Sequence, residues 1–342
     1  MKNIRDLSKE QLTEWLLEQG EPKFRASQIY DWLWKRFVRD FDSMRNIPKS
    51  LRDKLQEHFT IPAVAISTAQ HSSDGTIKLG FELHDGHFVE GVLIPSGKRM
   101  TACISSQVGC SLSCTFCATG YLPRKRNLEF DEIFDQVALI RELAEETYDR
   151  PLSNIVLMGM GEPLLNYKNV LKAMEKVSDP EAMGMSPQRI TLSTAGISKM
   201  IKKLGDDGVR FNLALSLHAS SNEKRSKIMP INESNTLEDL VEALNYFYDK
   251  TGSRITLEYC VIDGVNDSKE DAAELTAFAR QIKCKINLIE YNPIDMAEFK
   301  SSKAIDRFAQ ILEKNRLIVN VRRSRGKDID AACGQLANKS QS

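Results

Sequence analysis

The sequence contains no apolar run of the roughly 18 residues that a membrane-spanning helix needs. Its first residues, MKNIRDLSKEQ, also lack the apolar stretch of a secretory signal peptide. Net charge is absent as well, because 47 basic residues balance 47 acidic residues, whereas a domain that binds nucleic acid usually carries a basic excess. These absences predict a cytoplasmic protein with no membrane partner, and they confine any RNA contact to local basic patches.

Aromatic residues are also scarce, at 7% of a 342-residue chain, but a hydrophobic fraction of 42% is ample for a buried core. A chain of this length accommodates one barrel-sized catalytic domain with a small appendage. Its seven cysteines are an odd number, and a reducing compartment disfavours structural disulfides. Metal-binding or catalytic thiols are therefore the favoured interpretation of the cysteines.

Residues 1–75 are predicted to form a small helical accessory domain. Three segments, 7–20, 26–37 and 48–59, space their apolar residues three and four positions apart, as amphipathic helices do. Their charges are mixed, so we interpret this domain as a packing or docking module in preference to a direct RNA contact. In residues 76–99, apolar and polar residues alternate on either side of an Asp-Gly turn, which predicts a β-hairpin extension.

A parallel α/β fold is predicted for residues 100–337. Strand-like segments alternate with helical ones about six times, near residues 101–106, 154–159, 189–194, 211–217, 254–262 and 285–291. Such alternation builds a parallel sheet, and near-continuous apolar strands indicate that it is covered on both sides. We expect a partial (β/α)6 barrel rather than an open doubly wound sheet, with functional residues at the carboxyl ends of its strands. The polar tail, residues 338–342, is expected to be disordered.

Three cysteines follow the first predicted barrel strand directly: Cys110, Cys114 and Cys117. Iron–sulfur clusters need thiolates that converge from a compact loop. Three such ligands leave one iron of a four-iron cluster without a protein ligand, and that iron can bind the amino and carboxylate groups of S-adenosylmethionine. The alternative is a structural zinc site, which normally wants four ligands and would take Cys103 as the fourth.

Glycine and polar residues end the later strands of the predicted barrel. Glycine lets a ligand approach the backbone closely, and exposed carbonyl groups accept hydrogen bonds from an ammonium group. Each residue taken singly has a structural explanation, such as a tight turn, but all of them should meet on the rim that carries the cysteine loop. They are Gly159, Gly161, Glu162 and Pro163 after the second strand, Ser193 after the third, Ser216, Leu217 and His218 after the fourth, and Asn292 after the sixth.

The C-x-x-x-C-x-x-C spacing is shared with the radical S-adenosylmethionine superfamily. From about residue 20 to 337 the chain resembles the radical methyltransferases that modify adenine in 23S ribosomal RNA and, in the dual-specificity branch, in transfer RNA. The resemblance is carried by FRASQI, SSQVGCSLSCTFCATG, RNL, GMGEPLLN, LSTAG, SLHA, RSKIMPIN, DGVND, YNP and DIDAACGQL. A sister branch that methylates carbon 8 tends to show GMGEALAN, so GMGEPLLN favours methylation of carbon 2. The carbon-8 enzyme and a non-catalytic, zinc-stabilised RNA-binding protein are the two alternatives.

The resemblance implies the cofactors and the residues that bind them. A [4Fe–4S] cluster would be held by Cys110, Cys114 and Cys117. Two molecules of S-adenosylmethionine would be used in each turnover, with an external electron donor. The implied cofactor contacts are Gly161, Glu162, Ser193, Ser216, Leu217, His218 and Asn292.

The resemblance also implies the catalytic residues. Cys333 would take a methyl group from one S-adenosylmethionine, and a 5′-deoxyadenosyl radical from the second would remove hydrogen from that methyl group. Cys103 would then release the RNA adduct and leave a Cys103–Cys333 disulfide, which an external reductant opens by thiol exchange. Glu90 would be the base that removes the carbon-2 proton, and its parity with Phe88 and Val92 along one strand points it inward.

Two basic segments are candidates for RNA contact through phosphate neutralisation. The alternative for such a run is an ordinary solvated surface. One segment, 124–126, lies just beyond the cysteine loop, and the other leads towards Cys333 and contains Lys314, Arg316, Arg322, Arg323, Arg325 and Lys327. The two remaining cysteines, Cys260 and Cys284, lie in apolar strand patterns and are expected in the core.

Overall fold

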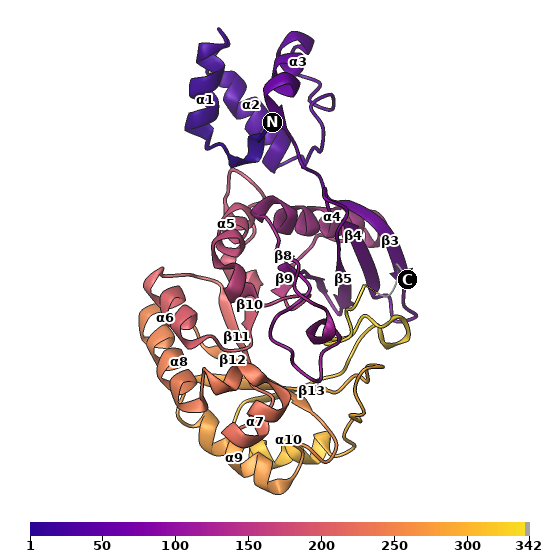
Figure 1. Ribbon diagram of the computed structural model, residues 1–342, viewed down its shortest axis with the longest axis vertical. Helices are drawn as coiled ribbons and strands as arrows, with labels where there is room; N and C mark the ends of the chain where they lie inside the picture. The colour runs from indigo at the N-terminus through magenta and orange to yellow at the C-terminus, as the bar shows by residue number, and fades with distance from the viewer. Residues whose placement is uncertain (339–342) are drawn as a thin grey trace.

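The computed structural model describes residues 1–338 (Figure 1). The chain begins with a helical unit of three helices, α1 (Lys9–Glu18), α2 (Phe24–Trp34) and α3 (Lys49–His58), and a short parallel pair of strands, β1 (Lys2–Asn3) and β2 (Phe59–Thr60). Helix α1 begins where it does because Ser8 and Gln11 cap each other's backbone N–H groups. The predicted helices of the first domain are therefore present.

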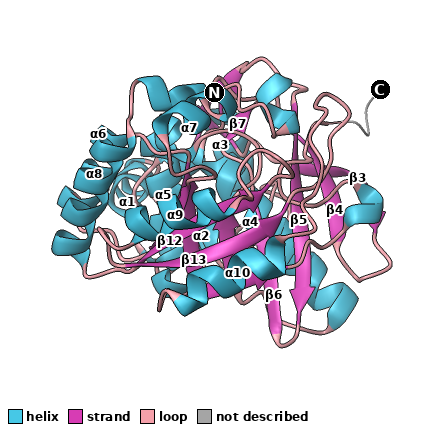
Figure 2. Cartoon of the chain, turned by 90° about the horizontal axis from the view of Figure 1, so that it is seen from below, coloured by secondary structure: helices cyan, strands magenta, loops and turns pink. Residues whose placement is uncertain are grey.

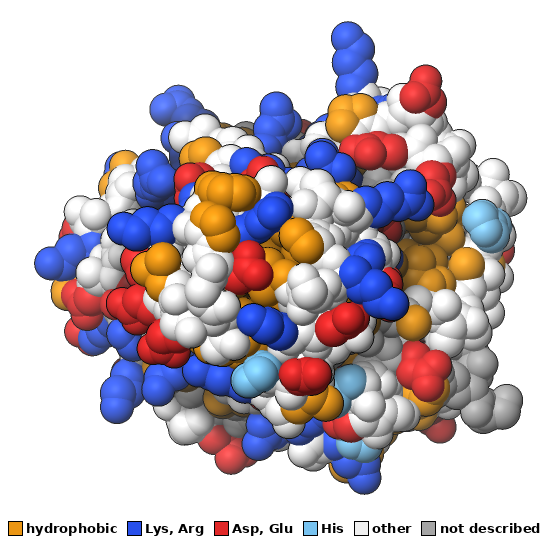
Figure 3. Space-filling model, turned by 90° about the horizontal axis from the view of Figure 1, so that it is seen from above, with side chains coloured by type: hydrophobic (Ala, Val, Ile, Leu, Met, Phe, Trp, Pro, Cys, Tyr) orange, Lys and Arg blue, Asp and Glu red, His pale blue; other side chains and the backbone are white. Residues whose placement is uncertain are grey.

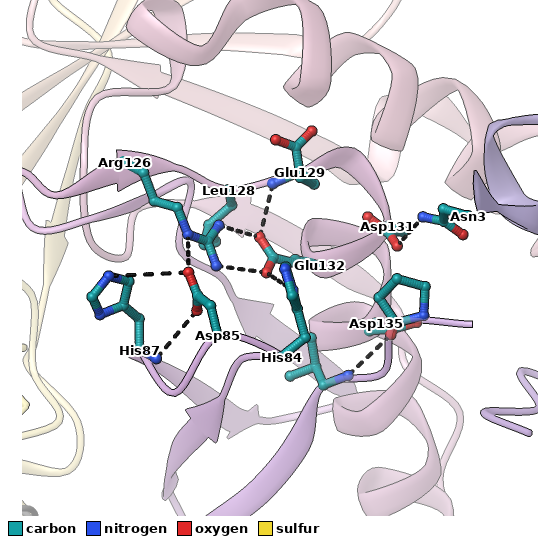
Figure 4. Close-up of polar contacts among 12 residues, drawn as sticks. Asn3, His84, Asp85, His87, Arg126, Leu128, Glu129, Asp131, Glu132 and Asp135 are labelled. Carbon is teal, nitrogen blue, oxygen red and sulfur yellow. Dashed lines mark hydrogen bonds and ion pairs between the residues drawn. The ribbon is translucent and has the colours of Figure 1, made fainter. Parts of the chain in front are cut away.

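The helical unit is attached to the rest of the chain by buried polar contacts. The Arg5 guanidinium donates to Asp135 Oδ1 at 2.6 Å, and both side chains are buried. Beside this pair, Asn3 Nδ2 donates to Asp131 Oδ2 at 2.7 Å (Figure 4). Both acids lie on helix α4 (Phe130–Tyr148), so the N-terminal unit is anchored to the first long helix of the main domain.

The main domain is built on one sheet of ten strands in the order β14-β13-β12-β11-β10-β9-β6-β5-β4-β3. The strands from β6 to β14 are parallel, and β3 to β5 extend the sheet antiparallel at one edge. Their bounds are β3 Ala65–His71, β4 Ile77–Glu82, β5 Phe88–Ser96, β6 Arg99–Cys103, β9 Asn154–Leu157, β10 Ile190–Thr194, β11 Asn212–Ser216, β12 Ile255–Val261, β13 Cys284–Glu290 and β14 Val319–Arg322.

Helices connect the parallel strands and cover the outer side of the curved sheet (Figures 1 and 2). After α4 they are α5 Tyr167–Ser178, α6 Ser198–Asp206, α7 Asn222–Ile228, α8 Leu237–Thr251, α9 Lys269–Ala279 and α10 Ile305–Lys314. A short antiparallel pair, β7 (Gln107–Val108) with β8 (Arg126–Asn127), closes the cysteine loop. The predicted α/β fold with a parallel, barrel-like sheet is confirmed, and all six predicted barrel strands are present.

Two strands were not predicted from the sequence. Strand β14 pairs with β13 as a seventh parallel strand, although it lies inside the basic run. Strand β3 lies within the first 75 residues, which were expected to be helical, and pairs with β4. Six of its seven residues are exposed, so it carries no alternation of apolar and polar positions. The sheet extension therefore begins at Ala65 rather than at residue 76.

The C-terminal segment returns to the first strands of the sheet. In Figure 1 this yellow segment lies beside the indigo strands of the antiparallel extension, and Asn338 Nδ2 donates to the carbonyl of Phe88 at 2.9 Å. Residues 339–342 lie outside the described part of the chain, so the expected disorder of the tail stays a prediction. Within residues 1–338, no helix is long and apolar enough to cross a membrane.

Candidate active site

A cavity of about 250 Å³ opens where the parallel strands end. Its wall includes residues from strands β6 to β14, from the cysteine loop and from the C-terminal segment. The predicted site residues that line it are Cys103, Cys110, Cys114, Cys117, Gly161, Glu162, Ser193, Ser216, His218 and Cys333. Three predicted residues, Glu90, Leu217 and Asn292, are not part of the lining.

The cysteine loop is held in a tight conformation by close backbone contacts. Gly120 packs so closely that an added Cβ would lie 2.5 Å from the carbonyl oxygen of Cys114. Gly109 has φ +76°, a left-handed conformation that glycine adopts without strain. The amide of Cys117 donates to the Cys114 carbonyl at 3.3 Å. These contacts bring three thiols, from Cys110, Cys114 and Cys117, to one side of the cavity.

The three thiols of this loop fit an iron–sulfur cluster better than a single metal ion. Among residues 1–338, no group of three or more Cys, His, Asp or Glu side chains is arranged to hold one ion. Ligands of a four-iron cluster bind separate irons, so they need not converge on one point. Burial raises the pKa of the Cys110 thiol to about 11, and positive iron would favour the thiolate form that ligation requires. The geometry gives no support to the zinc alternative.

Glu162 ties two strand ends together from within the cavity wall. Its Oε2 accepts from the amide of Ala195 at 2.7 Å and its Oε1 from Leu164 at 3.0 Å. Burial raises the pKa of this carboxyl group. The neighbouring Gly161 has φ +91°, and an added Cβ would lie 2.4 Å from Gln107 Cβ. Packing alone therefore requires glycine at this position, in addition to any contact with a cofactor.

Hydroxyl and imidazole groups form the opposite part of the wall. Ser193 Oγ and Ser216 Oγ lie 3.4 Å apart at the ends of β10 and β11. His218 Nδ1 accepts from the amide of Cys260 at 2.9 Å, and the ring packs edge-on against Phe116 of the cysteine loop. Burial, with a contribution from Arg225, lowers the pKa of His218 to about 3. The imidazole is therefore neutral at physiological pH.

Arg225 is a supporting residue that the sequence did not single out as a site residue. Its guanidinium is fully buried behind the rim and donates to the carbonyls of Ala195 at 2.5 Å and Leu217 at 3.1 Å. The side chain of Leu217 itself is buried in the core. The RSKIMPIN segment thus supplies the donor that fixes the ends of β10 and β11. An arginine inside an otherwise conventional helical segment gave no spacing signal for this role.

The segment that carries Cys333 is fixed against the cysteine loop. The Gly334 carbonyl accepts from the amide of Ala118 at 2.7 Å, and the Leu336 carbonyl accepts from Thr119 Oγ1 at 2.7 Å. Asn292 Nδ2 donates to the carbonyl of Cys333 at 3.3 Å, whereas the buried Asn292 Oδ1 has no hydrogen-bond partner. A buried amide oxygen without a donor is a natural place for a ligand to bind.

The two thiols of the predicted reaction share the cavity. Cys333 is accessible from it, although protein surrounds the thiol closely and this burial raises its pKa to about 11. Burial also raises the pKa of Cys103 to about 12, and the charge of Cys333 contributes. The positive charge of Arg322 acts to lower the pKa of both thiols. Nucleophilic use of either thiol therefore needs help with losing its proton.

The other two cysteines differ in their placement. Cys260 is buried, as expected of a core residue, but it also lines the cavity and interacts electrostatically with Cys333. Cys284 begins strand β13, lies away from the cavity and is partly buried. The expectation of two simple core cysteines is therefore incomplete for Cys260.

Glu90 points inward, as its parity predicted, and is almost completely buried. Its carboxylate is already engaged: Lys78 Nζ lies 2.9 Å from Oε1, and the amide of Ala337 donates to Oε2 at 2.7 Å. Lys78 was not recognised from the sequence, because a lysine in a strand normally faces solvent. In this arrangement Oε2 accepts from the Ala337 amide, Oε1 faces the Lys78 ammonium without a hydrogen bond, and Glu90 is not part of the cavity lining.

The fold pairs most of the cations that were considered for RNA contact. Arg126 makes ion pairs with Glu132 at 2.7 Å and with Asp85 at 2.6 Å (Figure 4). In the second run, acids from other elements pair with Arg322, Arg323, Arg325 and Lys327. Figure 3 shows basic and acidic side chains interspersed on the face seen from the N-terminal end. Several cations of the basic segments are thus already paired with acids, and RNA contact through these segments stays a prediction.

Comparison with known proteins covers nearly the whole chain. Residues 2–61 match the ribosomal RNA large subunit methyltransferase N-terminal domain, and residues 104–276 match the radical SAM superfamily. A Cytophaga hutchinsonii protein described as a probable dual-specificity RNA methyltransferase RlmN is 60% identical over 340 residues, 99% of this chain and 93% of the relative. A Christiangramia forsetii protein of the same description is 56% identical, with 99% and 97% covered.

The fold comparison agrees with these relatives. The crystal structure of a radical SAM methyltransferase from Sphaerobacter thermophilus superposes with a TM-score of 0.93 at 39% identity, covering 98% of this chain and 99% of that one. Both the N-terminal unit and the barrel are included in such coverage. The chain therefore belongs to the radical SAM superfamily and, within it, to the family of dual-specificity RNA methyltransferases.

Proposed function

We propose that this enzyme methylates carbon 2 of a specific adenine in 23S ribosomal RNA and in transfer RNA, with Cys333 as the carrier of the methyl group. The observation that carries the proposal is that Cys103 and Cys333 line the same cavity as the three thiols of the cysteine loop. An enzyme that transferred the methyl group of S-adenosylmethionine directly to RNA would need neither Cys103 nor Cys333. These proposed substrates imply that the enzyme works in the cytoplasm.

The cofactors of the family are a [4Fe–4S] cluster and S-adenosylmethionine. Cys110, Cys114 and Cys117 would hold the cluster. When bound, these cofactors supply the carbon radical that removes hydrogen from a methyl group. Ser193, Ser216, His218 and the free Oδ1 of Asn292 would position S-adenosylmethionine, with Gly161, Glu162 and Leu217 forming the strand ends beside it.

Cys333 and Cys103 have different roles in the rest of the proposed reaction. Cys333 receives a methyl group, loses hydrogen from it, and becomes joined to carbon 2 of the adenine. The adduct loses the carbon-2 proton and one electron, which would return to the cofactors. The Cys103 thiolate then attacks the sulfur of Cys333, and the carbon–sulfur bond breaks with its electron pair on the carbon. That carbon takes up a proton to become the methyl group, and a Cys103–Cys333 disulfide remains for an external reductant to open. The accessible position of Cys333 suits the carrier, and the buried position of Cys103 keeps the second thiol away from solvent.

Glu90 would accept the carbon-2 proton, and this role has a structural condition. Its Oε2 is occupied by the amide of Ala337, so that hydrogen bond must open before the carboxylate can meet the adenine. Lys78 would remain as the paired cation on Oε1. Movement of the C-terminal segment and exposure of the base are therefore coupled.

RNA binding would involve exchange of ion pairs. Arg323 is 54% exposed and paired with Glu290 and Asp306. A phosphate group can replace the Asp306 carboxylate, which is 66% exposed, at small cost, because exposed ion pairs contribute little stability. The target adenine must also leave its stack to reach the cavity.

Anaerobic reconstitution followed by nucleoside analysis tests the proposal. We expect bound iron and sulfide, and 2-methyladenosine in both RNA classes. Cys114→Ala should lower bound iron and stop formation of 5′-deoxyadenosine. A product methylated at carbon 8 would show that the chain has the activity of the carbon-8 methyltransferases. A colourless protein that binds zinc and leaves RNA unmodified would exclude catalysis.

A further inference from the structure

A buried glutamate in the cavity wall has no part in the proposed reaction. Glu258 lies in the middle of strand β12, opposite Ser216 on β11 and Asn287 on β13. The residue is 3% exposed and lines the cavity. The sequence alone does not single it out, because a single acid in an apolar strand gives no motif.

Only one oxygen of this carboxylate has a hydrogen-bond donor within the described chain. Asn287 Nδ2 donates to Glu258 Oε1 at 2.9 Å, and Asn320 Nδ2 donates to Asn287 Oδ1 at 3.3 Å, which fixes the orientation of the Asn287 amide. Glu258 Oε2 accepts no hydrogen bond. A buried carboxylate oxygen without a donor is costly, so a ligand that donates there would complete the site.

A donor from the protein lies next to this free acceptor. Arg322 Nη1 is 3.6 Å from Glu258 Oε2, beyond hydrogen-bonding distance, and the Arg322 side chain is about half exposed. Both charges act on the thiol of Cys333. The cavity therefore presents an acceptor and a donor side by side, close to the sulfur that would carry the methyl group.

Adenine matches this pair along one edge. It presents the N6 amino group as donor beside N7 as acceptor, whereas guanine presents two acceptors, O6 and N7, along the same edge. Carbon 2 lies on the opposite side of the ring from this edge. A ribose diol would also satisfy both groups, since each hydroxyl donates and accepts, and the KM for S-adenosylmethionine separates that ligand from adenine.

We propose that Glu258 and Arg322 read the N6–N7 edge of the target adenine, with Glu258 Oε2 accepting from the amino group. This inference rests on the proposed function and adds a specificity-determining residue to it. Held in this way, the ring has carbon 2 on the edge away from Glu258 and Arg322, and carbon 8, which adjoins N7, lies on the side of Arg322. The same contact excludes guanine, because O6 would face the carboxylate.

Glu258→Gln tests the contact with almost no change of shape. Because Asn287 donates to the Oε1 position, the new side chain keeps its oxygen there and places its NH2 group at the former Oε2 position. A donor then faces the adenine amino group, whereas it matches the O6 acceptor of hypoxanthine. We expect the preference for adenine over inosine at the target position, measured as a ratio of kcat/KM values on synthetic RNA, to fall about 10- to 100-fold.

Two further measurements separate this inference from the proposed function. Glu242→Gln makes the same chemical change at an exposed carboxylate on helix α8, outside the cavity, and it should keep the wild-type ratio. The KM for S-adenosylmethionine in cofactor cleavage should stay at the wild-type value in Glu258→Gln. An unchanged adenine-to-inosine ratio, or a raised KM for S-adenosylmethionine instead, would overturn the reading of adenine by Glu258. Absence of carbon-2 methylation by the wild-type enzyme would overturn the proposed function.

Discussion

Glu90 Oε2 accepts a hydrogen bond of 2.7 Å from the backbone amide of Ala337, 247 residues later in the chain. This hydrogen bond joins the proposed base to the segment that carries Cys333. The Glu90 carboxylate is therefore held against the chain just beyond Cys333. In this arrangement Glu90 is buried, whereas Cys333 lines the cavity.

The Lys78–Glu90 ion pair is nearly inaccessible to solvent, with side chains 4% and 2% exposed. Lys78→Met would leave the Glu90 charge buried without its cation, so we expect a loss of about 3–5 kcal/mol in the free energy of unfolding. Denaturant unfolding under anaerobic conditions measures it. Lys78→Met/Glu90→Leu, which removes both charges, should recover most of the loss; equal instability of the single and double variants would contradict this interpretation.

Cys103→Ala should stall the reaction after carbon–carbon bond formation. The RNA would remain joined to Cys333 by a carbon–sulfur bond, because no thiol is present to break it. Denaturing gels should show a protein–RNA species that survives thiol reductants, since a thioether does not exchange with thiols.

The control for the stalled species is Cys103→Ala/Cys333→Ala, which removes the sulfur that would form the link and should show no such band. Cys260 lines the same cavity, so Cys260→Ala in the Cys103→Ala background shows whether the third thiol releases any of the adduct. Normal turnover by Cys103→Ala and by Cys103→Ala/Cys260→Ala would show that Cys103 has no part in the mechanism.

Arg323 and Lys327 share Glu290 as an ion-pair partner, at 2.6 and 2.7 Å. If they exchange it for phosphate groups, replacing both with Ala should weaken RNA binding. The slope of log affinity against log salt should fall by about one for each phosphate group that the variant no longer neutralises. Lys227→Ala, which removes an exposed cation paired only within helix α7, serves as the control. Identical salt slopes for all three proteins would mean that the basic run is a solvated surface.

His218 should make stability depend on pH. Burial lowers its pKa to about 3, so the folded protein binds fewer protons than the unfolded chain, whose histidine titrates near about 6.5. The stabilisation that comes from neutral His218 is therefore fully present above the unfolded pKa of about 6.5. It is lost as the pH falls towards the folded pKa. Unfolding measured between about pH 7 and pH 5.5 should show a smaller loss in His218→Asn than in wild type.

The control for this pH effect is His58→Asn, which removes an exposed histidine at the end of helix α3. It should keep the wild-type dependence on pH. If His218→Asn lost stability with falling pH as steeply as wild type does, His218 would not be the group responsible.

Features that depend on local spacing were predictable from the sequence. The spacing of apolar residues predicted the helices and the six parallel strands, because buried positions recur at regular intervals along a helix or a strand. The cysteine loop was equally visible, since Cys110, Cys114 and Cys117 lie within eight residues. Because the carboxyl ends of parallel strands meet at one edge, the position of each strand end also predicted that Ser193, Ser216 and His218 would share a cavity.

The partner of each charged group was not predictable from the sequence and became visible in the folded chain. Glu90 meets Lys78 and Ala337, and Arg323 meets Glu290 and Asp306, through contacts that no local pattern records. The exposed strand β3 and the charged strand β14 also became visible only when paired with their neighbours. The physical reason is that hydrogen bonds and ion pairs depend on distances across the fold, which sequence spacing constrains within one element and not between elements that lie far apart in the chain.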